Sequence, residues 1–158
     1  MAIARTLINY LKDRGIDYQL IAHEHTPTAA ASAHAAHLPT HQVAKAVVLK
    51  DDNVVPANHS LEIDWVNEAL ERKLELACED EFKKLFGDCE TGAVPALGDA
   101  YGLKVIWDDE LAYTADVYIE AGDHEHLIWL ERRDFRKLMK DLPHTIISKD
   151  EEVGCWKY

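Results

Sequence analysis

The run QVAKAVVLKDD, residues 42–52, restricts the folds open to this chain more than any other stretch. Its valines and leucine favour a strand, and residues 51–53 (Asp, Asp, Asn) are typical of a turn. A second short apolar pair, Val54 and Val55, follows directly after that turn. The pattern predicts a β-hairpin over residues 43–58.

Lys45 places a cation inside the first, largely apolar strand of this hairpin. A cation held on fixed backbone is suited to face an anion or a carbonyl group of a ligand. The alternative is an edge-strand lysine that discourages aggregation and contacts only water. Both interpretations stay open, and Lys45 is a candidate site residue.

The length of 158 residues, with 47% apolar and 29% charged residues, is enough for a core that needs no metal or disulfide. We expect one domain over residues 1–158, with a core at about 5–140 and a loosely specified tail at 144–158. The three cysteines form no CxxC pair, so a reducing compartment fits best.

Two further properties restrict where the protein acts and what it binds. No window approaches the roughly 18 apolar residues of a membrane span, and the N-terminus lacks the apolar core of a signal peptide, so we expect a cytoplasmic protein. The net charge of -12 argues against broad electrostatic binding of nucleic acid. A nucleic-acid partner would therefore have to be held locally.

Helical and strand periodicities alternate along the chain without a repeated βαβ period. Between them, residues 91–102 (TGAVPALGDAYG) contain three of the seven glycines and predict a shaped loop. The fold class expected is α+β, a single mixed-sheet domain with surrounding helices. We expect helices over residues 2–14, 28–38, 63–70, 79–87 and 132–140, and further strands over 16–23, 74–77, 104–107, 115–121 and 126–130.

Nine histidines raise the question of a metal site. Two pairs at i and i+2 would share a strand face, but both adjoin turns, no HExxH motif is present, and Pro39 ends a predicted helix before His41. Solvated loop histidines are the preferred interpretation, and we expect no metal and no other cofactor. The histidines considered are His23 and His25, His124 and His126, and His34, His37 and His41.

Charged residues are segregated in the C-terminal half. Residues 105–130 hold seven acidic residues and no lysine or arginine, which predicts a solvated acidic face. Arg132, Arg136 and Lys140 are spaced by four on the last predicted helix. This stripe would make weak phosphate contacts, although cations near a helix C-terminus are also explained by the helix dipole alone.

The sequence contains no motif for a serine or cysteine nucleophile or for a phosphate-binding loop. No serine lies in a GxSxG context, and no pattern ties Cys78 or Cys89 to a histidine. The glycines of residues 92–102 match neither a phosphate-binding Walker loop nor a dinucleotide fingerprint.

The order of the pieces resembles the YbaK/EbsC family of aminoacyl-tRNA deacylases, which are related to the editing domain inserted in bacterial prolyl-tRNA synthetases. The resemblance covers about residues 5–140. It rests on an opening amphipathic helix, the sequence YQLIAHEHTPT, the lysine-bearing strand QVAKAVVL, the loop TGAVPALG and the strand-turn-strand VYIEAGDHEHLIWL followed by a helix.

This resemblance implies a free-standing domain that hydrolyses the ester between a wrong amino acid and the 3′ end of tRNA, often tRNA for proline. In the family, the lysine similar to Lys45 helps to hold the terminal nucleotide or its acyl group, and the loop similar to 92–95 surrounds the scissile carbonyl. A preorganised N–H or cation stabilises the developing oxyanion, and a positioned water can attack. The candidate catalytic residues are Lys45 and Glu120, and the candidate substrate-binding residues are His23, Gly92, Ala93, Val94, Pro95, Gly122 and Asp123.

The chain departs from the family pattern at several positions. Ala46 stands where a threonine commonly follows the lysine, Glu120 replaces a hydroxyl residue, and Leu127 falls near an acidic position of the cysteinyl-tRNA deacylase branch. Glu120 would be a water-activating base if it is partly desolvated near Lys45, and otherwise a surface glutamate. A non-catalytic module that binds a nucleotide, a tRNA end or a protein is the alternative function.

Overall fold

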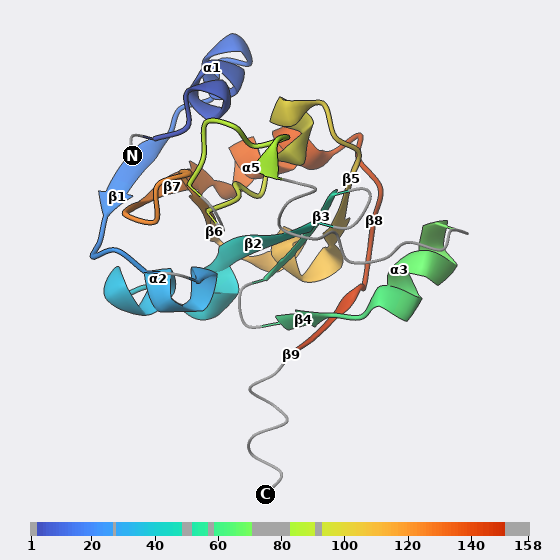
Figure 1. The fold of residues 1–158 in the computed structure, drawn as a ribbon. Coiled ribbons are helices and arrows are strands. Elements are labelled where there is room, and N and C mark those ends of the chain that lie inside the picture. The colour runs from blue at the N-terminus through green and yellow to red at the C-terminus, as the bar shows by residue number, and fades with distance from the viewer. Residues whose placement is uncertain are drawn as a thin grey trace, which may run out of the picture.

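The chain folds around a mixed seven-stranded sheet (Figure 1) with the strand order β1-β7-β6-β2-β3-β5-β8. The computed structural model describes residues 3–26, 28–48, 52–56, 59–70, 83–90 and 93–150. The sheet combines antiparallel pairs (β1/β7, β7/β6, β2/β3) with parallel ones (β6/β2, β3/β5, β5/β8), which confirms the expected α+β class with a mixed sheet. The strands are β1 (Gln19–Ala22), β2 (Val43–Val48), β3 (Asp52–Pro56), β5 (Val105–Asp108), β6 (Asp116–Glu120), β7 (His126–Glu131) and β8 (His144–Thr145).

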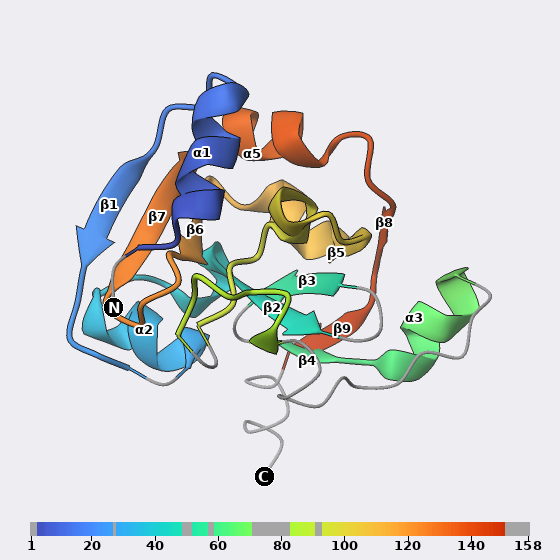
Figure 2. The same cartoon turned by 45° about the horizontal axis from the view of Figure 1, so that its top comes forward.

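Helices cover both faces of the sheet. Figure 2 shows α1 and α5 side by side on one face, and α2 on the opposite face beneath β6 and β7. A separate two-stranded sheet pairs β4 (His59–Leu61) with β9 (Ser148–Asp150). The helices are α1 (Arg5–Asp13), α2 (Ala29–Ala35), α3 (Ile63–Leu70) and α5 (Arg132–Met139), with 3-10 turns η1 (Thr40–Gln42), η2 (Gly98–Tyr101) and η3 (Asp109–Tyr113).

Two of the buried clusters follow from the alternation of side chains along the strands. On β2, Ala44 is buried in the main core between the sheet and helices α1 and α5. Its neighbour Val43 is buried in a smaller core with Ala33 of α2 and Leu127 of β7. Lys45 therefore belongs to the α2 side of the sheet.

Several predicted elements are confirmed. The hairpin exists as the antiparallel pair of β2 and β3, with Lys45 opposite Val55. The predicted N-cap of the second helix is present, since the Thr28 hydroxyl accepts a hydrogen bond of 3.1 Å from the Ala31 amide. The predicted strand 74–77 and the start of the predicted helix 79–87 lie outside the described residues.

The segment that follows Pro143 differs from expectation. We expected a loosely specified tail from residue 144, but residues 144–150 contain β8 and β9, and Ile147 is fully buried. The short strand β9 pairs with β4, with Ser60 opposite Lys149. Strands of two and three residues carry too little periodicity to be recognised in a sequence.

Candidate functional site

The turn between β6 and β7 organises the candidate site. Gly122 has a φ of +102°, and a Cβ there would lie 2.8 Å from the Ala4 Cβ. Asp123 is buried, and its Oδ1 accepts hydrogen bonds of 2.9 Å from the amides of Glu125 and His126. Its Oδ2 lies 2.6 Å from His126 Nδ1. Burial by itself raises the pKa of Asp123, but these hydrogen bonds and the His126 ring hold that pKa below its usual value.

The Asp123 carboxylate is therefore occupied within the protein. We predicted it as a substrate-binding residue, and that role stays a prediction; in the structure both of its oxygens have protein partners, which hold the turn. The sequence pattern did not reveal this, because an aspartate after glycine is compatible with either role.

Glu120 ends β6 with a desolvated carboxylate. Its side chain is only 8% exposed, and Oε1 accepts hydrogen bonds from the amides of His124 (3.2 Å) and Gly122 (3.4 Å). Burial raises the pKa of Glu120, and the nearby rings of His124 and His23 oppose that rise. The raised pKa makes this carboxylate a better proton acceptor than an exposed glutamate.

The histidines of this region are not solvated loop residues as a group. His124 is 7% exposed and has a φ of +62°. Its ring lies 5.1 Å, centroid to centroid, from the ring of His25, whose Nε2 is 3.7 Å from Glu90 Oε2. The expectation of solvated histidines is therefore wrong for His124, which we did not predict as a site residue.

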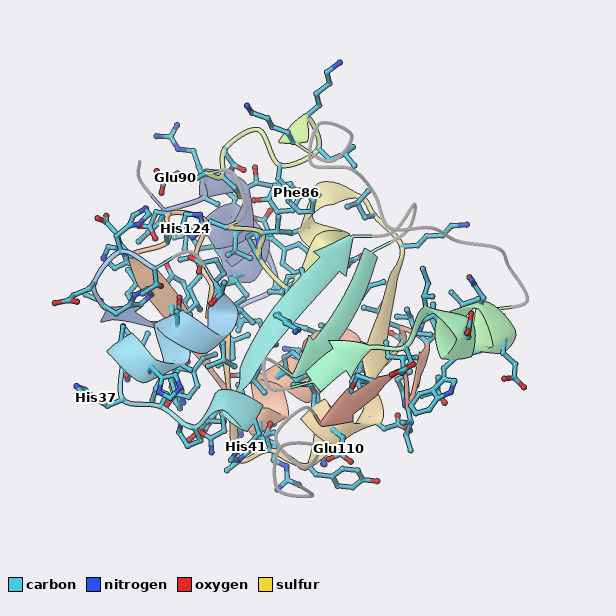
Figure 3. All side chains as sticks on the ribbon, turned by 60° about the horizontal axis from the view of Figure 1, so that its bottom comes forward. His37, His41, Phe86, Glu90, Glu110 and His124 are labelled. Atoms are coloured by element: carbon cyan, nitrogen blue, oxygen red, sulfur yellow. The ribbon has the colours of Figure 1, made fainter. Side chains whose placement is uncertain are left out.

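The segment before the glycine-containing loop also contacts the turn. The Glu90 amide donates a hydrogen bond of 2.8 Å to the Gly122 carbonyl, and the Ala93 amide donates one of 2.9 Å to the Glu90 carbonyl. Figure 3 shows the side chains of Glu90 and His124 close together at one side of the molecule. Ala93 and Pro95 are buried and Val94 is half-buried, whereas Gly92 lies outside the described residues.

Lys45 is next to Glu120 in the register of the sheet. The parallel pairs Val43–Tyr118 and Ala44–Ile119 bring the next residues, Lys45 and Glu120, side by side where β6 ends. Side-chain alternation directs both to the α2 face. Ala96 and Leu97, by contrast, belong to the main core, so this end of the loop and Lys45 lie on opposite faces of the sheet.

Cys89 is not an activated nucleophile. Its Sγ lies 3.3 Å from the Tyr101 hydroxyl, which donates a hydrogen bond of 2.9 Å to Asp88. Burial raises the pKa of the Cys89 thiol to about 12, and the nearby carboxylates of Asp88 and Glu120 add to the rise. The thiol stays protonated at neutral pH.

The predicted cationic stripe of the last helix lies elsewhere. The Arg136 guanidinium donates a hydrogen bond of 2.5 Å to the Ala112 carbonyl. Lys137 and Lys140 line a hollow of about 440 Å³ with Arg14 and Asp99, between the ends of α1 and α5. This hollow contains none of the predicted site residues.

Two negative findings apply to the described part of the chain. There, no group of three His, Cys, Asp or Glu side chains is arranged to hold a metal ion. In the same ranges, none of the helices is long and apolar enough to cross a membrane.

The family model for the aminoacyl-tRNA editing domain matches residues 23–138. This range contains Glu120, Lys45 and the β6–β7 turn, and it covers most of the chain. The chain belongs to the aminoacyl-tRNA editing domain family. None of the curated proteins matches the editing-domain chain.

Solved structures of low sequence identity share the editing-domain fold. A protein proposed as a trans-editing enzyme for prolyl tRNA synthetase is 20% identical, with a TM-score of 0.78 over 92% of this chain and 96% of that one. The hypothetical protein APE2540 is 21% identical, with a TM-score of 0.77 over 92% and 100% of the two chains. A proposed signal transduction protein from Marinobacter aquaeolei VT8 matches over only 30% of its own length, with 18% identity and a TM-score of 0.74.

Proposed function

We propose that this editing-domain protein is a cytoplasmic aminoacyl-tRNA deacylase that hydrolyses the ester of mischarged tRNA, with tRNA for proline as the first candidate. Water attacks the ester carbonyl while Glu120 takes up one of its protons. The bond between the carbonyl carbon and the ribose oxygen then breaks, and the proton passes to that oxygen. The products are the free amino acid and the tRNA.

The observation that carries this proposal is the desolvated Glu120 carboxylate beside two histidines in an editing-domain fold. Its burial raises the pKa of Glu120, as a general base requires. Lys45 is its register neighbour and would hold the terminal nucleotide or the acyl carbonyl. Loop residues Gly92, Ala93, Val94 and Pro95, with Gly122, would surround the carbonyl, and His23 would contact the substrate.

The test is release of amino acid from a panel of mischarged tRNAs by the purified protein. Lys45→Ala should lower kcat/KM by about 100-fold or more, the usual cost of removing one group that stabilises an oxyanion. The control Lys104→Ala removes the same charge from an exposed position ahead of β5 and should retain activity. If the wild-type protein releases amino acid from none of the mischarged tRNAs, the proposal is wrong.

A non-catalytic binding module is the second candidate. The observation that favours it is that Glu120 Oε1 already accepts two backbone hydrogen bonds, which is also what a structural carboxylate does. Such a module would be stabilised by aminoacyl-adenosine analogues without turnover. A ligand at 100 times its dissociation constant stabilises by about 2.7 kcal/mol, which a thermal melt resolves.

A further inference from the structure

Two buried side-chain atoms near the β6–β7 turn lack hydrogen-bond partners among the described residues. They are His23 Nε2 and Glu90 Oε2. A buried polar atom without a partner costs about 1–3 kcal/mol, so such atoms are rare and call for an explanation. His25 Nε2 lies 3.7 Å from Glu90 Oε2, beyond hydrogen-bonding distance.

The contact between His25 and Glu90 does not account for the buried oxygen. The His25 side chain is 57% exposed, and solvent-exposed ion pairs of this length contribute little. The Glu90 oxygen therefore lacks a strong partner among the described residues.

Both unpaired atoms are hydrogen-bond acceptors. His23 Nδ1 lies 2.6 Å from the Glu24 carbonyl oxygen, which can only accept, so Nδ1 carries the proton. In the neutral ring Nε2 is then an acceptor, as a carboxylate oxygen always is. Two buried acceptors without donors are suited to a ligand group rich in N–H donors, and an ammonium group has three donors and no acceptor.

The two residues adjoin the same turn. The His23 amide donates a hydrogen bond of 2.9 Å to the Glu125 carbonyl, and the Glu90 amide donates one of 2.8 Å to the Gly122 carbonyl. Glu120, whose carboxylate accepts from the Gly122 amide, adds a further negative charge to this region. Both acceptors therefore belong to residues that are anchored on the turn to which Glu120 is hydrogen-bonded.

We propose that Glu90 and His23 bind the α-ammonium group of the aminoacyl ester, an inference that rests on the proposed function. Glu90 Oε2 accepts a charge-assisted hydrogen bond from this group, and His23 Nε2 accepts a second. The site thereby selects esters of amino acids with a free α-amine over N-acylated or α-hydroxy acyl groups. It also fixes the acyl carbonyl relative to Glu120.

The experiment measures binding, so that it is independent of hydrolysis. The probes are amide-linked 3′-aminoacylamino-3′-deoxyadenosines of glycine, alanine, serine, cysteine and proline, with their N-acetyl derivatives and, for alanine, the lactyl counterpart. Titration calorimetry with the full chain should show the free-amine form binding at least about tenfold more tightly than its acetylated or hydroxy partner, as expected for a charged hydrogen bond.

Two variants and a control assign the preference to the acceptors. Glu90→Gln should reduce the preference to about twofold or less, and His23→Phe, which keeps a ring without an acceptor nitrogen, should reduce it in part. Glu110→Gln removes an equal charge from an exposed residue that lies far from Glu90 (Figure 3) and should leave the preference intact. A thermal melt of each variant verifies folding.

The outcomes separate the two proposals. If no analogue binds the wild-type protein, both the proposed function and the ammonium site are wrong. If the free-amine and hydroxy analogues bind equally, or if the preference survives in both Glu90→Gln and His23→Phe, the ammonium site alone is wrong. Deacylation of mischarged tRNA can still occur in that case.

Discussion

The buried carboxylate of Glu120 lowers the stability of the folded protein when it is ionised, and the same carboxylate is the proposed general base. Its folded-state pKa is raised by burial, so the folded protein binds its proton more readily than the unfolded chain does. The stability contributed by this proton is fully present below the unfolded pKa and is lost as pH rises through the folded pKa. Above that pH the protein keeps a buried, incompletely compensated charge.

Glu120→Gln should therefore stabilise the protein at neutral pH while it removes activity. Glutamine retains an oxygen for the amides of Gly122 and His124 but carries no charge. We expect a gain of ~1 kcal/mol, about 2–4 °C in Tm, with a deacylation rate lower by about 100-fold or more. Thermal melts at pH 4 and pH 8 test the sign, because the gain should be largest at the higher pH.

The exposed Glu110→Gln serves as the control for this experiment and should shift Tm by less than about 1 °C at either pH. A Glu120→Gln protein that melts lower than wild type at pH 8 would contradict the assignment of a desolvated carboxylate. Unchanged deacylation would contradict its role as the base.

Gly122 shows a second constraint at the scale of one residue. Gly122→Ala places a Cβ 2.8 Å from the Ala4 Cβ and 3.2 Å from Cys89 Sγ, at a φ of +102°. We expect a loss of about 2–4 kcal/mol in the free energy of unfolding. Urea unfolding measures it.

Gly102→Ala is the matched control for Gly122→Ala. Gly102 also has a positive φ, +74°, but a Cβ there meets nothing within 4 Å. The Gly102→Ala variant should therefore lose only about 1 kcal/mol in the free energy of unfolding, the cost of a left-handed backbone at a non-glycine residue. Adding Ala4→Gly to Gly122→Ala should recover part of the larger loss, since it removes one of the clashing atoms. Equal losses of stability in Gly122→Ala and Gly102→Ala would refute the close packing of Ala4 on the turn.

Asp108 connects three elements through one buried carboxylate. At the end of β5, its Oδ1 accepts a hydrogen bond of 2.8 Å from the Glu110 amide at the start of η3. Its Oδ2 accepts from the Ile147 amide (2.9 Å) and from the Ser148 hydroxyl (2.6 Å). These hydrogen bonds anchor residues 147 and 148 to the end of β5. The expectation of a solvated acidic face over residues 105–130 is wrong for three of its members, because Asp108, Glu120 and Asp123 are buried.

Asp108→Asn should destabilise the protein by about 2–4 kcal/mol, because an amide NH₂ replaces one oxygen and leaves buried donors without an acceptor. The urea midpoint should fall, and the Ile147 amide should exchange faster with deuterium. Asp141→Asn, at an exposed position, should change stability by less than about 0.5 kcal/mol. Unchanged protection of Ile147 would contradict the anchoring role.

The elements that the sequence predicted share a strong local signal. The hairpin of β2 and β3 combines β-branched residues with a turn, and α2 begins at a side-chain cap, so both could be recognised without tertiary contacts. β9 depends on the distant partner Asp108, and no local pattern marks this short strand. Lys45 and Glu120 were recognisable because each departs from its surroundings, whereas His124 and Glu90 gain significance only from the folded turn.

The charge of the whole molecule limits how it can hold tRNA. With a net charge of -12, the protein cannot attract a polyanion over its entire surface, and contacts must be few. The stripe of α5 is the proposed place for weak phosphate contacts, through Arg132, Arg136 and Lys140. Arg136 is already committed in part to the Ala112 carbonyl, so Arg132 and Lys140 carry more of this proposal.

The number of these contacts is measurable from the salt dependence of tRNA binding. Each phosphate contact contributes about 0.7 to the slope of log affinity against log salt on a single strand, so three contacts predict a slope of about -2 and an affinity that falls about 20-fold between 50 and 200 mM salt. Arg132→Ala and Lys140→Ala should each make the slope shallower by about 0.7, whereas Lys104→Ala, outside the stripe, should not. A slope unchanged in both variants would mean that α5 does not contact phosphates. The tRNA would then be held at its acylated end alone. An acidic protein can bind in this way, because the desolvated site near β6 needs no basic surface around it.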